Sequence, residues 1–351
     1  MYLRRSAVLK YLVLAPLCIV LYCEWLVYVI QPLFWQNLEC PSDDNSCTKV
    51  LFIADPQIQG DLAVPPPLSY IFNCDSDRYL KSTFSVVLKH FKPDVLVFLG
   101  DLMDEGSIST IPQFHRYVKR VMNIFDVEYP IVQVWLPGDN DIGGENEPIR
   151  KDKVIEFEKV FQQPQIITFR NISFYKVNAI TNSIPEVIQE PEDTNYKIVV
   201  SHYPILSRSM FGKQVNAAIR PNVFFCAHDH QSKYAKQSKD FMSKKTYPLP
   251  YGAPVLNIVA DEDLYEIYVP TCSYRMGTSK MGYGAAVLEN HNQYMRYAVF
   301  WSPQRFPHLV TYLFVGIILV ICILFACIRQ VFSRSKRSDK RDDSLPLLQR
   351  I

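Results

Sequence analysis

Two long apolar segments, one near each end, constrain this 351-residue chain more than any other feature. Residues 11–30 are apolar apart from Pro16 and Glu24, and residues 309–328 carry no charge. About 20 helical residues cross a hydrocarbon core of roughly 30 Å, so each segment is predicted to be a transmembrane helix. The alternatives are a cleaved signal peptide for the first, although no small-residue cleavage site follows it, and a buried core helix for the second.

Flanking charge predicts the orientation of these two segments. Three basic residues precede the first segment and six follow the second: Arg4, Arg5, Lys10, Arg329, Arg334, Lys336, Arg337, Lys340 and Arg341. The positive-inside rule then puts residues 1–10 and 329–351 in the cytosol, and residues 36–307 in a lumen or outside the cell. Asn171-Ile172-Ser173 offers a glycosylation acceptor in that central segment, which agrees with this orientation.

Charge and cysteine use narrow the class of protein. A net charge of +2 argues against a dedicated nucleic-acid surface, so no nucleic-acid partner is expected. Cys40 and Cys47 bracket the short loop PSDDNS and could form a local disulfide in an oxidising compartment. Cys74, Cys226 and Cys272 form an odd set, so at least one of them is expected to be free.

The central segment alternates short apolar runs with longer amphipathic ones. Its first half predicts strands at 49–55, 94–101 and 130–139 and helices at 80–91, 112–125 and 152–161. Its second half predicts mainly strands, at 171–179, 196–204, 222–230, 264–270, 283–290 and 294–301. Apolar strands alternating with helices are typical of a sheet covered on both faces. We therefore predict an α/β sandwich of two packed sheets flanked by helices, with one transmembrane helix at each end.

Five of the predicted strands end in potential metal ligands. These strand ends carry Asp55 with Gln57, Asp101 with Asp104, the run Gly138-Asp139-Asn140-Asp141, His202, and His228-Asp229-His230. A lone Asp after a strand is usually a turn residue, but ligands do gather at the carboxyl ends of strands in α/β sheets. Five such ends in one domain predict a shared metal site. Two divalent ions can clamp the attacking and leaving oxygens of a phosphoryl transfer, and mixed oxygen and imidazole ligands suit Mn, Fe or Zn better than Ca.

In this order, the five motifs resemble those of the calcineurin-like metallophosphoesterase superfamily. The similarity is greatest to its membrane-anchored branch, which removes ethanolamine phosphate from GPI anchors, and it extends to LYCEWLVYVI, FLGDLMDEG, KVIEFEKVF, SHYPILSRS and EIYVPTCSYRMG. The resemblance implies a metallophosphoesterase-type sandwich with two divalent ions, Mn²⁺ above all. It also implies a phosphodiesterase that aids transport of GPI-anchored proteins, at the endoplasmic reticulum, its exit sites and the cis-Golgi.

The resemblance assigns ligands motif by motif. The first ion would be held by Asp55, Gln57 and His230, Asp101 would bridge, and the second ion would be held by Asp139, His202 and His228. Arg275 lies where the family carries a basic residue near the substrate, although an ordinary ion-pair arginine is the alternative.

Three positions depart from the family pattern. Gln57 replaces a histidine, and its amide oxygen suits Mn²⁺ better than Zn²⁺. Asp139 replaces an asparagine, so a third carboxylate should hold metal more tightly and leave a bound water less acidic. Asn140 replaces a histidine that in the family donates a proton to the leaving oxygen or stabilises the charge of the transition state. Acid–base help of this kind is typically worth ~10²–10⁴-fold, and asparagine cannot release a proton near neutral pH. Asp141 would thereby lose the partner that it orients in relatives.

Two functions therefore remain open from the sequence. One is a working phosphodiesterase, slow or using a substitute acid. The other is a catalytically impaired metal-binding homologue that recognises GPI-anchored cargo or assists its trafficking. The basic tail, residues 329–351, is expected to be disordered, and its acidic dileucine-like run Asp343–Leu348 would bind trafficking adaptors.

Overall fold

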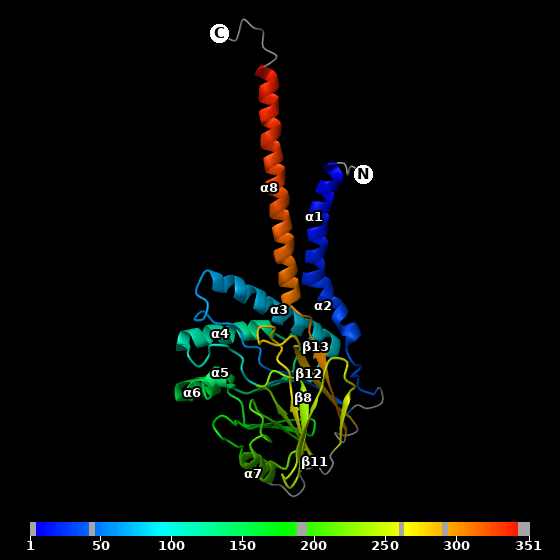
Figure 1. The fold of residues 1–351 in the computed structure, drawn as a ribbon. Coiled ribbons are helices and arrows are strands. Elements are labelled where there is room, and N and C mark those ends of the chain that lie inside the picture. The colour runs from blue at the N-terminus through cyan, green and yellow to red at the C-terminus, as the bar shows by residue number, and fades with distance from the viewer. Residues whose placement is uncertain (1–4, 42–45, 188–194, 260–262, 290–293, 343–351) are drawn as a thin grey trace. The chain divides into compact units, whose positions relative to one another are not determined.

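The computed structural model describes residues 5–41, 46–187, 195–259, 263–289 and 294–342. These residues form two compact units, which are Met1–Leu26 with Arg305–Ile351, and Val27–Gln304. Figure 1 gives the elements in chain order along the ribbon. The dileucine-like run at Asp343–Leu348 lies outside the described residues.

The first unit contains the two long apolar helices that the sequence predicts. It comprises α1 (Arg5–Leu21), a π-helical turn η1 (Tyr22–Leu26) and α8 (Phe306–Asp342). Lys10–Phe34 and Phe306–Gln330 are long and apolar enough to cross a membrane. Glu24, the acid of the first segment, accepts hydrogen bonds from Arg305 Nη1 at 2.9 Å and from the Tyr312 hydroxyl. The charged group is therefore paired rather than left alone in an apolar setting.

The prediction of disorder from residue 329 onward is wrong for the residues that the structure describes. Helix α8 continues from the apolar segment through Asp342. No proline or glycine occurs between Gly316 and Pro346, so the chain has no residue that would break a helix already nucleated by the apolar segment.

The second unit is built on two mixed sheets. The first sheet has the order β10-β13-β12-β1-β2-β3 and the second β4-β5-β6-β7-β11-β8-β9. The strands of the first sheet are β1 (Thr48–Ile53), β2 (Val95–Phe98), β3 (Val132–Trp135), β10 (Leu256–Val259), β12 (Gly282–Glu289) and β13 (Tyr294–Trp301). Those of the second are β4 (Ile166–Phe169), β5 (Ile172–Lys176), β6 (Tyr196–Val200), β7 (Val223–Cys226), β8 (Lys233–Ser238), β9 (Lys244–Pro248) and β11 (Asp263–Tyr268).

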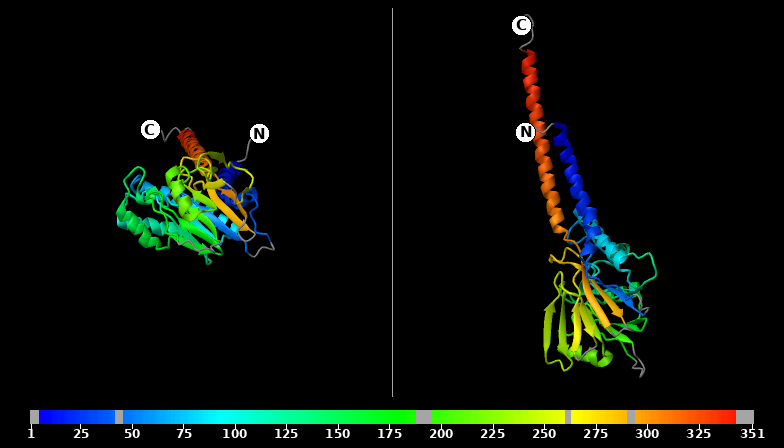
Figure 2. Two further views of the ribbon diagram at one scale, coloured as in Figure 1. Left: turned by 90° about the horizontal axis from the view of Figure 1, so that it is seen from below. Right: turned by 90° about the vertical axis from the view of Figure 1, so that its right-hand side faces the viewer.

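The two sheets pack face to face around the main apolar core, and Figure 2 shows them as separate layers. Val50, Phe52 and Ala54 of the first sheet share this core with Val223 and Phe225 of the second. The rings of Phe52 and Phe225 stack with their centroids 3.8 Å apart. The predicted α/β sandwich is therefore confirmed.

Helices cover the outer faces of the sandwich. The helices of the second unit are α2 (Val27–Ile30), the 3-10 turn η2 (Gln31–Phe34), α3 (Leu68–Phe91), α4 (Ile111–Ile124), α5 (Asp139–Ile142), α6 (Lys151–Phe161) and α7 (Ser209–Ile219), of which α5 is a single turn in the loop after β3. Phe84 of α3 contacts the ring of Tyr283 on β12, while Phe211 and Val215 of α7 pack against the outer face of the second sheet. Thr110 begins α4 with a capping box that also uses Gln113, which explains why α4 begins there.

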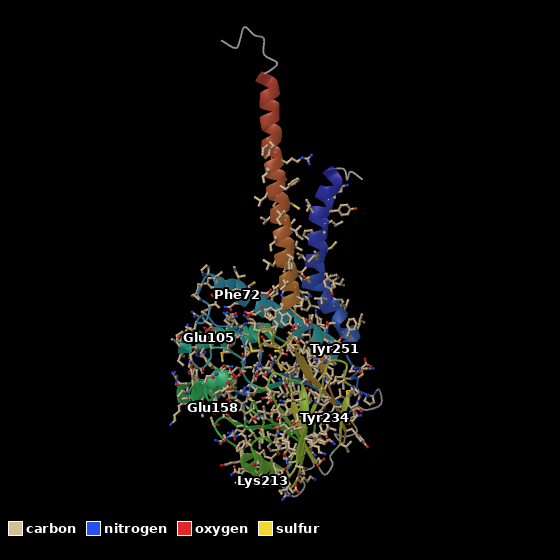
Figure 3. All side chains as sticks on the ribbon, in the orientation of Figure 1. Phe72, Glu105, Glu158, Lys213, Tyr234 and Tyr251 are labelled. Atoms are coloured by element: carbon tan, nitrogen blue, oxygen red, sulfur yellow. A yellow bond between two sulfur atoms is a disulfide. The ribbon has the colours of Figure 1, made fainter. Side chains whose placement is uncertain are left out.

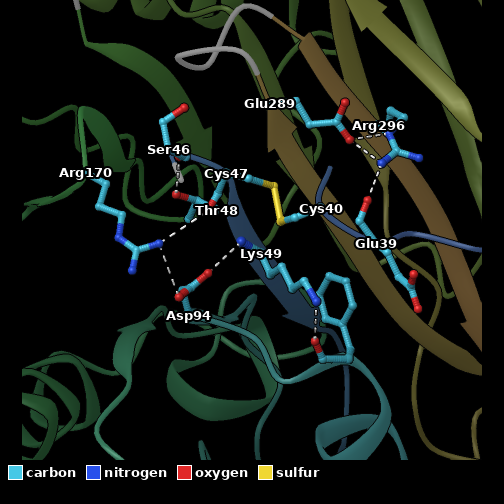
Figure 4. The surroundings of a disulfide bond; sticks show 11 residues. Glu39, Cys40, Ser46, Cys47, Thr48, Lys49, Asp94, Arg170, Glu289 and Arg296 are labelled. Carbon is cyan, nitrogen blue, oxygen red and sulfur yellow. Dashed lines mark hydrogen bonds and ion pairs between the residues drawn. A yellow bond between two sulfur atoms is a disulfide. The ribbon is translucent and has the colours of Figure 1, made fainter. Parts of the chain in front are cut away.

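The predicted disulfide joins Cys40 to Cys47, while Cys74, Cys226 and Cys272 are free. Figure 4 shows that this disulfide lies beside β1, where Lys49 N donates to Asp94 Oδ2 at 2.9 Å. The chain thus enters the first sheet at a covalently fixed point.

The partly buried amine of Lys176 is expected to lower the free energy of unfolding of the second unit. It lines a cavity of about 530 Å³ beside Trp135 and Phe161, and burial lowers its pKa to about 8. Lys176→Met should raise the free energy of unfolding by about 1–3 kcal/mol at neutral pH, because one pKa unit corresponds to about 1.4 kcal/mol.

The sign of the pH dependence follows from that lowered pKa. The folded state disfavours the charged amine, so the charge lowers the free energy of unfolding fully below pH 8. This destabilisation disappears as the pH rises towards 10.5. Thermal unfolding of the full chain in detergent should therefore give a higher melting temperature for Lys176→Met, with a gain that shrinks as pH rises. Lys245→Met, at an exposed position on β9, is the control and should change little. Equal changes in melting temperature for both variants would contradict the conclusion that the buried charge of Lys176 destabilises this unit.

Candidate metal centre

The loops after five strands converge at one edge of the sandwich. Asp55 follows β1, Asp101 follows β2, Asp139 follows β3, His202 follows β6 and His228 follows β7. Several of these loops have backbone in the left-handed region, with φ of 47° at Asp55, 52° at Asp101 and 67° at His228. Such conformations are costly for residues with a Cβ and cluster at functional sites.

Six of the seven predicted ligands fall into two groups. Asp139, His202 and His228 have ligand atoms within 4.8 Å of one another, and so do Asp55, Asp101 and His230. Asp101 also borders the first of these groups, since its Oδ1 lies 3.4 Å from His202 Nε2. The bridging position that the resemblance gives to Asp101 agrees with this geometry.

His202 is oriented for ligation by a backbone carbonyl. Its Nδ1–H donates to Leu99 O at 2.9 Å, which leaves Nε2 directed at Asp139 Oδ1, also at 2.9 Å. A metal-binding histidine is usually fixed in this way through its other ring nitrogen. His228 approaches the same oxygen of Asp139 with its Nδ1, at 3.2 Å.

The charges in this cluster fit a pair of divalent cations. Burial, with the nearby charge of Asp101, raises the pKa of Asp55 to about 8, and burial also raises the pKa of Asp101. Burial acts on Asp139 too, but hydrogen bonds from His202 and His228 outweigh it and lower the pKa of Asp139. Asp55 Oδ2 is buried without a hydrogen-bond partner among the described residues. Buried carboxylate oxygens are normally satisfied, so this oxygen suits a cation.

Gln57 directs its amide group at the carboxylate of Asp101. Its Nε2 donates to Asp101 Oδ2 at 2.8 Å and lies 3.4 Å from His230 Nε2. A half-turn of the amide would present Oε1 instead, which is the atom that could bind a cation.

Asn140 contacts the predicted bridging carboxylate directly. Its backbone N–H donates to Asp101 Oδ1 at 2.9 Å, and its Nδ2 donates to Asp101 Oδ2 at 2.7 Å. The side chain is thus at the centre of the site, as its motif predicts, and it can donate hydrogen bonds without releasing a proton.

Asp141 has no histidine at position 140 to orient, but its carboxylate has other partners. Its carboxylate accepts hydrogen bonds from the backbone N–H groups of Leu102 at 3.1 Å, Met103 at 3.0 Å and Gly138 at 2.9 Å. Asp141 therefore ties the loop after β2 to the loop after β3, which fixes Asp101 relative to Asp139.

Arg275 supports the Gln57 loop rather than standing free. Its Nη1 donates to Gln57 O at 2.9 Å and its Nη2 pairs with Asp104 Oδ2 at 2.8 Å. The structure thus connects Arg275 to the site through a ligand loop, and the ion-pair alternative describes its contacts.

Two further side chains border the cluster without having been predicted. The ring of Tyr203 lies 4.4 Å from that of His228 between centroids, and Glu145 Oε1 lies 3.8 Å from His228 Nε2. Tyr203 follows His202 in the sequence, which was an available signal. For Glu145 the sequence offers no signal except its position directly after the two glycines that follow α5.

Comparisons with known proteins agree with this site. The family model described as calcineurin-like phosphoesterase matches residues 48–232, more than half of the chain. Metallophosphoesterase 1 of Ailuropoda melanoleuca is 27% identical over 181 residues, covering 50% of this chain and 45% of the relative. Metallophosphoesterase 1 of Danio rerio is 28% identical over 173 residues, covering 48% and 44%.

Among solved structures, a metallophosphoesterase from Sphaerobacter thermophilus covers 72% of this chain and 88% of its own, at 12% identity and a TM-score of 0.36. That likeness is too low to support an argument. The chain matches less than half the length of the two curated relatives. The family match spans the five strand-end motifs up to His230, and on this ground the chain belongs to the calcineurin-like phosphoesterases, a family of metal-dependent phosphoric ester hydrolases.

Proposed function

We propose that this protein is a membrane-anchored phosphodiesterase with two divalent ions, Mn²⁺ by preference, that removes ethanolamine phosphate from the GPI-anchor glycan. The observation that carries the proposal is the unsatisfied, buried Asp55 Oδ2 within two adjoining groups of Asp and His ligands. The motifs that the chain shares with the membrane-anchored branch of the family support the substrate class. Removal of this group would aid transport of GPI-anchored proteins from the endoplasmic reticulum to the Golgi.

The protein's own residues would bind and orient the phosphoester. The residues that would hold two divalent ions are Asp55, Gln57, His230, Asp101, Asp139, His202 and His228. Such ions would polarise a phosphoryl oxygen and lower the pKa of a water molecule. Asn140 would donate a hydrogen bond to a phosphoryl oxygen at the centre of the site. Asp141 would keep the two carboxylate loops at a fixed separation through its three backbone contacts.

The proposed topology has both termini in the cytosol and the second unit in the lumen. The basic residues flanking the apolar helices support it. The disulfide between Cys40 and Cys47 suits an oxidising compartment, and Asn171, the glycosylation acceptor, is exposed at the turn between β4 and β5. The proposed compartments are the endoplasmic reticulum, its exit sites and the cis-Golgi.

A second candidate function rests on Asn140. Its side chain cannot protonate a sugar alkoxide, which is a poor leaving group, so a site that binds metal and substrate without turnover is consistent with this residue. In that function the protein would recognise GPI-anchored cargo and assist its trafficking.

Asp101→Asn tests the enzymatic function. The substitution keeps the shape of the side chain but removes the charge between the two ligand groups, so we expect metal occupancy and turnover to fall by at least about 100-fold. The measurements are metal content after Mn²⁺ loading of the purified full chain, and release of ethanolamine phosphate from a GPI glycan fragment. Asp126→Asn, at an exposed position beyond α4, is the matched control and should keep both.

The outcomes separate the two functions. Turnover that depends on Asp101 supports the phosphodiesterase. Full turnover in Asp101→Asn would overturn it. Bound metal without turnover in the unmodified protein, together with co-purification of GPI-anchored cargo, would favour the recognition role.

Asn140→His tests whether the missing proton donor limits turnover. We expect a gain of about 10–100-fold on a glycan substrate, because its alkoxide leaving group needs a proton. A nitrophenyl phosphodiester provides the control, since its leaving group departs without protonation and should show little gain. A gain of equal size on both substrates would contradict the proton-donor explanation and point to a general change in the loop.

A further inference from the structure

The start of α3 exposes an apolar surface that the metal centre does not use. Leu68, Tyr70, Ile71 and Phe72 in its first two turns, and Leu62 in the preceding loop, are between 47% and 68% exposed. We call these five residues the α3 apolar patch. Phe72, labelled on α3 in Figure 3, is 50% exposed. Several exposed apolar side chains this close together in the chain are a candidate binding face.

The patch is confined to one end of an amphipathic helix. Leu68, Ile71 and Phe72 share a face, because residues three and four apart in a helix are neighbours. The later turns carry charged residues instead, with Arg78 paired to Asp75 at 3.3 Å and Lys81 exposed, while Leu80, Phe84 and Val87 are buried. An apolar, aromatic face next to a charged one is typical of a helix that lies in a membrane interface.

Contacts within the second unit bring α3 to the place where the chain enters and leaves this unit. The chain enters through α2 and η2, which end the first candidate span, and both pack against α3. The rings of Tyr28 on α2 and Tyr79 on α3 lie 6.3 Å apart. The Tyr79 hydroxyl donates to Pro303 O at 2.7 Å, three residues before the second candidate span begins. Helix α3 thus contacts the end of the first candidate span and a residue just before the second.

The same segment is rigidly connected to the metal centre. Leu62 N and Ala63 N donate to Glu105 at 2.9 and 2.7 Å, so the loop is held in place only five residues after Gln57. Glu105, labelled in Figure 3, is itself buried and follows Asp104, the partner of Arg275.

We propose that the α3 apolar patch is a third membrane contact, which inserts into the interfacial layer of the lipid bilayer that the two apolar helices cross. The partner is a lipid surface, because the helix that carries the patch packs against the end of the first candidate span and hydrogen-bonds to a residue just before the second. It also exposes aromatic and aliphatic side chains next to charged ones. Tyr70 suits the headgroup level, and Leu68, Ile71 and Phe72 suit the acyl boundary. The contact holds the Gln57 loop close to lipid, and it does not depend on turnover.

The test is lipid quenching of a fluorophore on the full chain in nanodiscs. Exposed or partly exposed thiols are first removed by Cys18→Ser, Cys74→Ser, Cys322→Ser and Cys327→Ser, while Cys23, Cys226 and Cys272 are buried. An environment-sensitive dye is then attached at Ile71→Cys. Ile155→Cys on α6 is the matched control, since Ile155 is 65% exposed and Ile71 is 68% exposed.

The proposal expects blue-shifted emission at position 71 that falls about twofold when the nanodisc contains brominated acyl chains, and no such fall at position 155. Equal quenching at the two positions, or none at either, would overturn it. A blue shift at position 71 without quenching would also overturn it, and would identify the occupant as protein, either a second copy or another chain. None of these fluorescence measurements requires turnover. The test therefore remains valid even if the protein proves not to be a phosphodiesterase.

Discussion

The crowding of three buried carboxylates is the constraint on which the site depends. Asp55, Asp101 and Asp139 follow three neighbouring parallel strands, so the sheet itself forces their charges together. Two of them respond with raised pKa values, and the third is neutralised by His202 and His228. The protonated carboxyl groups would have to release their protons to hold a divalent ion, so loading of the site would depend on pH. The two-sheet sandwich is the frame that keeps the carboxylates close despite their repulsion.

The departures from the family pattern act on chemistry while leaving architecture intact. Asp141 accepts three backbone hydrogen bonds, so the loop that contains Asn140 is held in place whatever residue stands at 140. Asn140 keeps a donor directed at Asp101, where phosphoryl oxygens would bind, but it removes the transferable proton. Of the three departures, Asn140 is the one that removes a proton donor, so turnover depends most on this side chain.

How much of the fold could be read from the sequence depended on burial. Strands buried on both faces, such as β1, β2 and β7, were predictable from continuous apolar runs, and so were the ligands at their ends. The hairpin of β8 and β9 was missed because its residues are largely polar or exposed, and cross-strand pairing alone holds it. The first turns of α3 were missed because they bury mainly Ser69 and Ser76, so no apolar period faces the sheets. The structural role of Asp141 could not be predicted, because its partners are backbone amides, which carry no signal in the sequence.

The backbone carbonyl of Trp301, at the end of β13, links the two ends of the second unit. Trp301 O accepts hydrogen bonds from Gln31 Nε2 at 2.9 Å and Trp35 Nε1 at 2.8 Å, so the two ends of the second unit are fastened to each other. A domain whose ends meet resembles a closed loop, and such domains tolerate circular permutation and transfer between hosts. The sandwich is in this sense a cassette, and evolution or an engineer could exchange the two apolar helices without disturbing the strands that carry the candidate metal ligands.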